Sequence, residues 1–116
     1  MRAELKGLDA DGGDLRAFRP DAERFALAVT ASIGPAGDEG TEQFLFTVCS
    51  PSWLAGQELP KGFAFQRHTL VVERWNLDLV ERAIADLCRR AEGETWTEIA
   101  TKLSRFGSWE FEDYRE

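Results

Sequence analysis

The sequence predicts a single domain of the α+β class, an antiparallel β-sheet with two C-terminal helices packed on one face. In the first half of the chain apolar and polar residues alternate, which is the period of a strand with one buried face. In the second half apolar residues recur at every third or fourth position, as in an amphipathic helix. The chain has 116 residues, the length of one domain, so we treat residues 1–116 as a single unit.

Three segments show the strand period clearly. In residues 25–33 the apolar face holds Phe25, Leu27, Val29, Ala31 and Ile33, and in residues 43–49 it holds Phe44, Phe46 and Val48. The loop at residues 34–40 joins these two strands as a hairpin. Residues 69–73 form a third strand, and a weaker alternation over residues 3–8 predicts a strand before the hairpin. We expect the strands at residues 25–33, 43–49 and 69–73 in one antiparallel sheet.

The segment between the second and third of these strands contains breaks. Pro51 follows Ser50 and ends the strand, so we expect a single helical turn that carries Trp53 and Leu54. Residues 55–66 contain glycines and a proline and show no period, which is typical of a loop.

Two helices are predicted after this loop. The first covers residues 77–92, begins after the N-cap candidate Asn76 and ends at Gly93. The second covers residues 96–106 and begins with a capping box formed by Thr95 and Glu98. The apolar stripes of the two helices are Leu77, Val80, Ile84, Leu87, Cys88 and Ala91, and Trp96, Ile99, Leu103 and Phe106.

The C-terminal residues 108–114 alternate again, which fits either a last strand or an extended tail held by two aromatic rings. Parity places Trp109 and Phe111 on a packing face, and Glu110, Glu112 and Tyr114 on the outer face.

The charge balance disfavours several partner classes. The chain carries 14 basic and 21 acidic side chains, a net charge of −7, and such a protein is repelled by nucleic acid and by anionic membranes. The N-terminus lacks the apolar run of a secretory signal, and the longest apolar stretch is far below the ~20 residues of a membrane span. We therefore expect a cytoplasmic protein with reduced cysteines.

Few residues could carry catalysis. His68 is the single histidine, which rules out a metal site built from several histidines. Cys49 and His68 could form a thiolate–imidazole pair if their strands are neighbours, but their spacing does not require it. The sequence contains no phosphate-binding, dinucleotide-binding or zinc motif. We predict no catalytic residue, no metal and no cofactor.

Acidic residues cluster in three places: Asp9, Asp11 and Asp14, then residues 38–42, then residues 110–116, where Arg115 is the one basic residue. One interpretation is a solvated surface that keeps the protein soluble. The other is recognition of a basic partner, in which acidic charge speeds association and Tyr114 supplies an aromatic anchor. The candidate partner-binding residues are Asp38, Glu39 and Glu42 in the second cluster and Glu110, Glu112, Asp113 and Tyr114 in the third.

Several segments together carry a family resemblance: IGPAGDEG at residues 33–40, FTVCSPSWL at 46–54, GETW at 93–96, LSRFG at 103–107 and WEFEDY at 109–114. With them the chain resembles the immunity protein 8 family of bacterial polymorphic toxin systems, and residues 55–67 match least. The resemblance implies a small α+β protein, encoded beside a toxin, that binds and neutralises it without catalysis. Toxins of such systems are often nucleases with basic clefts. The resemblance supplies no contact residues, so the candidates above rest on charge.

Three hypotheses of different classes follow. The first is an immunity protein, the second a binding or assembly module that does not inhibit its partner, and the third a small enzyme that uses Cys49 and His68. Gene neighbourhood and co-purification with a toxin domain distinguish them.

Overall fold

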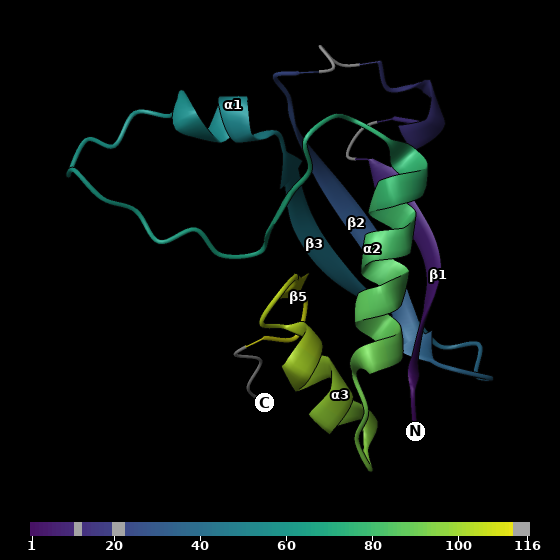
Figure 1. Ribbon diagram of the computed structural model, residues 1–116. Coiled ribbons are helices and arrows are strands. Elements are labelled where there is room, and N and C mark those ends of the chain that lie inside the picture. The colour runs from purple at the N-terminus through teal and green to yellow at the C-terminus, as the bar shows by residue number, and fades with distance from the viewer. Residues whose placement is uncertain (11–12, 20–22, 113–116) are drawn as a thin grey trace.

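The computed structural model describes residues 1–10, 13–19 and 23–112. In these residues five strands form one sheet, and the helical elements lie between the strands in the chain (Figure 1). The strands are β1 (Ala3–Ala10), β2 (Ala26–Pro35), β3 (Glu42–Cys49), β4 (Thr69–Val71) and β5 (Ser108–Trp109). The helical elements are the 3-10 turn η1 (Leu15–Ala17) and the helices α1 (Pro51–Ala55), α2 (Leu77–Arg90) and α3 (Trp96–Leu103).

The sheet has the order β1-β2-β3-β4, and β5 also pairs with β3. β1, β2 and β3 are antiparallel neighbours, and β2 and β3 form the predicted hairpin, with Val29 opposite Phe46. β5 lies beside the start of β3 and β4 beside its end, so both short strands occupy the same edge. The predicted α+β class is confirmed.

The direction of β4 corrects one expectation. β4 pairs with β3 in parallel, with Thr47 opposite Thr69 and Cys49 opposite Val71, whereas we expected this strand to be antiparallel. A parallel pair needs a crossover of a dozen or more residues, and α1 with the loop that follows supplies one. Alternation in a sequence reports which face of a strand is buried and carries no information about its direction.

The hydrophobic core lies between one face of the sheet and the two long helices, which both cover that face (Figure 1). Val29, Ile33 and Phe44 from the sheet are fully buried, as are Ile84 of α2 and Ile99 of α3. The strand and helix periods therefore predicted these five core residues correctly.

The end of α3 differs from the prediction. The helix stops at Leu103, and Phe106, expected on its apolar stripe, is 52% exposed. The chain turns there because Gly107 passes against the Phe46 ring so closely that a Cβ atom would lie 2.6 Å from it. The amide of Gly107 donates to the Leu103 carbonyl at 3.0 Å, which closes the turn and directs Phe106 outward.

The loop at residues 56–67 extends away from the body of the molecule (Figure 1). Its side chains are exposed, and Phe63 and Phe65 are 63% and 89% accessible. Within the described part of the chain, no helix combines the length and the apolar character that crossing a membrane requires.

Candidate partner-binding surface

The loop between β2 and β3 presents the first two acidic candidates. Asp38 and Glu39 are exposed, and Asp38 Oδ1 accepts the Gly40 amide at 3.2 Å. Lys6 of β1 donates to the Asp38 carbonyl and fixes the loop against the sheet edge. Neither carboxylate forms an ion pair with another described residue.

Glu42, the third residue of this cluster, has a role inside the fold. Its Oε1 accepts hydrogen bonds from the indole Nε1 atoms of Trp96 and Trp109, both at 2.8 Å. This one carboxylate joins the start of β3 to α3 and β5. The two donors lie 54 and 67 residues further along the chain, so local sequence could not reveal the contact.

The C-terminal acids adjoin the same end of β3. Glu110 is exposed, and its Oε2 accepts the Gln43 amide at 2.5 Å. Glu112, expected to point outward, pairs instead with Arg67 at 3.1 Å. Asp113 and Tyr114 lie outside the described residues.

Trp109 and Phe111, both expected on a packing face, pack differently in the structure. The Trp109 ring stacks on Phe44 with centroids 6.3 Å apart, as expected of a packing residue. Phe111 contacts Trp109 edge to face at 6.1 Å and remains 38% exposed. The strand alternative for this tail is confirmed for Ser108 and Trp109, after which the chain turns.

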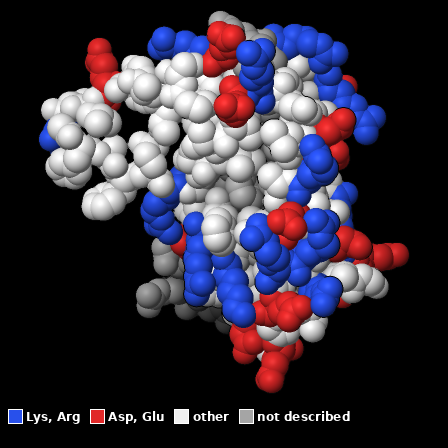
Figure 2. Space-filling view, in the orientation of Figure 1, with Lys and Arg blue, Asp and Glu red and all other residues white. Residues whose placement is uncertain are grey.

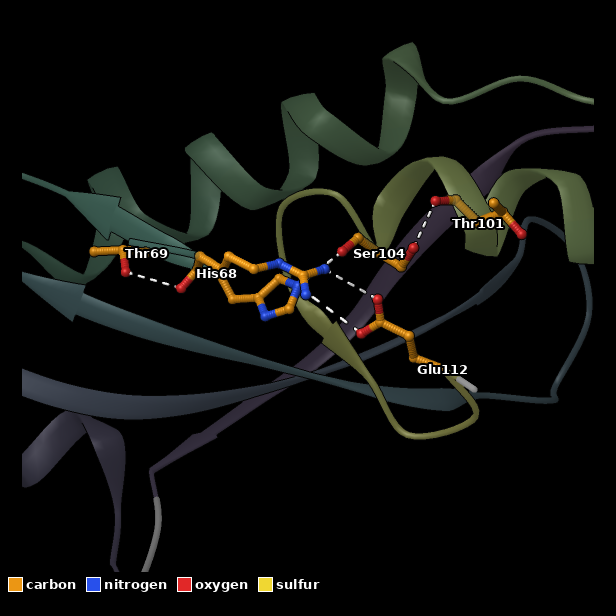
Figure 3. A network of polar contacts seen from close by, with 6 residues as sticks. His68, Thr69, Thr101, Ser104 and Glu112 are labelled. Atoms are coloured by element: carbon orange, nitrogen blue, oxygen red, sulfur yellow. Dashed lines mark hydrogen bonds and ion pairs between the residues drawn. The ribbon is translucent and has the colours of Figure 1, made fainter. Parts of the chain in front are cut away.

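His68 is at the centre of a polar network that ties β4 to the end of α3 (Figure 3). Its Nε2 lies 2.8 Å from the Ser104 carbonyl and 4.0 Å from Glu112 Oε2. Its backbone has φ +57°, in the left-handed region that residues other than glycine seldom adopt. His68 thus acts as a link between two elements.

A cleft of about 490 Å³ opens beside this network, between β4, α2 and the turn after α3. Its floor is apolar and its rim is basic. Figure 2 shows Lys and Arg side chains gathered on this side of the molecule. The lining residues include Phe46, Leu70, Ile84 and Leu87 on the floor and Arg67, Arg90, Arg105 and Asp86 around it. The three arginines come from separate segments, so the sequence offered no signal for the cleft.

Cys49 and His68 are not brought together as a pair. In the parallel register Cys49 lies opposite Val71, three residues beyond His68, which corresponds to about 10 Å along a strand. Cys49 is fully buried, and burial raises the pKa of its thiol, which disfavours the thiolate that a nucleophile needs. Among the described residues no three His, Cys, Asp or Glu side chains are grouped so that they could hold a metal ion.

The family comparison adds what the geometry alone does not supply. Residues 3–114 match the family described as Immunity protein 8. The chain belongs to the immunity protein 8 family. The resemblance stated from the sequence segments is thereby confirmed, and it covers nearly the whole chain. Membership of this family supports an immunity role, which implies a toxin as partner. No curated protein matches the chain, and no solved structure does.

Proposed function

We propose that this immunity protein binds a cognate toxin domain in the cytoplasm of the bacterium that makes both, and neutralises it by occupying its active surface. The observation that carries the proposal is the family match over residues 3–114. The separation of Cys49 from His68 supports a role in binding rather than in chemistry.

We further propose that acidic side chains of this protein attract the toxin. Asp38, Glu39 and Glu110 are exposed and supply charge directly. Glu42 and Glu112 support the same region through their contacts with the indoles and with Arg67. Asp113 and Tyr114 continue this segment along the chain. A toxin that cleaves nucleic acid fits such an inhibitor, because its own cleft must be basic to hold phosphates.

The test uses the toxin domain encoded beside this gene. The two proteins are co-expressed and purified together, and the activity of the toxin domain is measured with increasing amounts of the immunity protein. We expect a stoichiometric complex in which toxin activity is lost. Full toxin activity at saturating immunity protein would overturn the proposal. A stable complex with undiminished activity would identify the protein as a binding module without inhibition.

A further inference from the structure

We propose that the cleft between α2, β4 and the turn after α3 is a docking site for an acidic, partly apolar segment of the partner protein. Arg105 receives a carboxylate, and the floor receives an adjacent apolar side chain. The inference deepens the proposed function, since the partner is taken to be the toxin. It concerns a region whose charge is opposite in sign to that of the whole chain.

Among the described residues, Arg105 is the cleft-wall arginine without a carboxylate partner. Arg90 pairs with Asp86 at 2.7 Å, and Arg67 pairs with Glu112 at 3.1 Å. No carboxylate of the described residues lies within 4.0 Å of Arg105, which is exposed at the rim. A planar guanidinium beside an apolar floor is suited to bind a carboxylate through two parallel hydrogen bonds.

The shape of the site fits a segment of chain better than a single ion. A second hollow of about 260 Å³ also borders Leu87, Arg90, Arg105 and Phe106 and extends the cleft past Lys102. Phe106 stands at the shared border and is 52% exposed. Exposed aromatic side chains beside arginines are typical of binding surfaces, where they supply most of the affinity.

The rim of the cleft is already held in position. The Ser104 carbonyl, directly before Arg105, lies 2.8 Å from His68 Nε2 (Figure 3). Gly107, two residues after Arg105, passes closely against the Phe46 ring. A partner therefore does not have to order this turn, which lowers the entropic cost of binding.

A protein segment fits the charge of the whole molecule better than a nucleic acid does. The net charge of −7 repels a phosphate backbone, which carries a charge at every nucleotide. An acidic segment within a basic toxin brings only a few carboxylates to the cleft, while the rest of the toxin is attracted.

The first arm of the test uses three synthetic, end-capped peptides: Glu-Phe-Asp-Leu-Glu, its neutral analogue Gln-Phe-Asn-Leu-Gln and its basic analogue Lys-Phe-Lys-Leu-Lys. Each is titrated into the isotope-labelled protein while backbone amide shifts are recorded by NMR. We expect the acidic peptide to shift Leu87, Arg105 and Phe106 in a saturable way, and the other two to have much weaker effects. Equal binding of the acidic and neutral peptides, or shifts confined to other regions, would overturn the inference.

Two charge-reversal variants test whether Arg105 itself binds the acidic peptide. Arg105→Glu should weaken binding of the acidic peptide by about tenfold or more, because it places a like charge at the site. Arg82→Glu changes the same charge on α2 at a residue that does not line the cleft, and it should bind as wild type does. If the two variants bind the acidic peptide equally well, Arg105 has no specific role and the inference is wrong.

The second arm separates this inference from the proposed function. If wild type neutralises the toxin domain and Arg105→Glu, folded as shown by an unchanged denaturation midpoint, does so with equal affinity, the docking site is wrong and the function stands. If wild type neither binds nor neutralises the toxin, the function is wrong, and the peptide titrations still decide whether the cleft binds acidic segments.

Discussion

Glu42 shows how one side chain can hold three elements together. Its Oε1 accepts both indole N–H groups, from Trp96 at the start of α3 and from Trp109 in β5. From sequence it is one more acid beside an acidic loop. In the structure it fixes the region from which the C-terminal acids extend.

Removal of this acceptor should lower stability. We expect Glu42→Ala to reduce the free energy of unfolding by about 1–3 kcal/mol, because two half-buried donors lose their partner. Glu42→Gln keeps a carbonyl oxygen and should lose less. The exposed neighbour is the control: Glu39→Ala should stay within about 0.5 kcal/mol of wild type. Urea titrations measure all three, and equal midpoints for Glu42→Ala and wild type would contradict the role of Glu42.

Cys88 gives a second prediction at the scale of one residue, a pH dependence. Burial in the core raises the pKa of this thiol from 9.0 to about 11. The unfolded thiol ionises first as pH rises, so the buried neutral thiol stabilises the fold fully below pH 9 and loses this contribution as pH approaches 11. The loss is about 2–3 kcal/mol at 1.36 kcal/mol for each pKa unit.

The measurement compares wild type with Cys88→Ala in urea titrations from neutral pH to about pH 11, the pKa of the folded thiol. The variant lacks the thiol, so the difference between the two curves isolates this group from the lysines and other bases. We expect the advantage of wild type to shrink across this range. Parallel curves would show that the folded thiol titrates normally.

Helices and strands could be predicted from the sequence where their apolar residues form one face that packs in the core. The stripe of α2 places Val80, Ile84 and Cys88 in the interior as expected, and the helix ends within two residues of the predicted boundary. The end of α3 was not predictable, because it depends on Gly107 meeting Phe46, a ring from a different strand.

Ile84 provides the test of the α2 stripe. Ile84→Ala should lower the free energy of unfolding by about 2–5 kcal/mol, since the residue is 1% exposed and its removal leaves a cavity. Leu79→Ala on the same helix is the control, because Leu79 is 38% exposed and its loss should cost less than about 1 kcal/mol. Denaturant titration should separate the two variants clearly, and similar midpoints would be evidence against the packing described for α2.

The candidate site also depends on contacts between elements that are far apart in the sequence. Charge alone selected Asp38, Glu39 and Glu110 as candidates, and the structure shows that these residues are exposed. The basic cleft was missed because Arg67, Arg90 and Arg105 meet only after β4, α2 and the turn after α3 are assembled. Glu112 looked unpaired for a similar reason, since its partner Arg67 is 45 residues away in sequence.

At the scale of the whole molecule, the net charge of −7 should attract a basic partner before contact. Reversing two exposed charges should therefore change the association rate. Asp38→Lys combined with Glu39→Lys should slow association with a basic toxin domain at low salt and change dissociation little. The difference from wild type should shrink as salt rises, because exposed charges are screened over about 8–10 Å at physiological strength. Stopped-flow kinetics measure both rates.

Reversal of Glu110 and Glu112 is a less clean test of the same idea, because Glu112→Lys also breaks the ion pair with Arg67. The variant at Asp38 and Glu39 breaks no ion pair among the described residues. If this variant associates as fast as wild type at low salt, acidity does not contribute to recognition.

Because the loop at residues 56–67 projects from the body of the molecule, a cut in this loop should leave the rest of the fold assembled. Trypsin can reach Lys61 and cut the exposed bond to Gly62, and the nick would leave β1, β2 and β3 on one fragment and β4, β5 and both long helices on the other. The fragments share one core, and β4 and β5 of the second fragment pair with the outer edge of β3 in the first, so they should stay together as a complex of two pieces. The gene could then be divided at this point, and the two products would reassemble into the same protein.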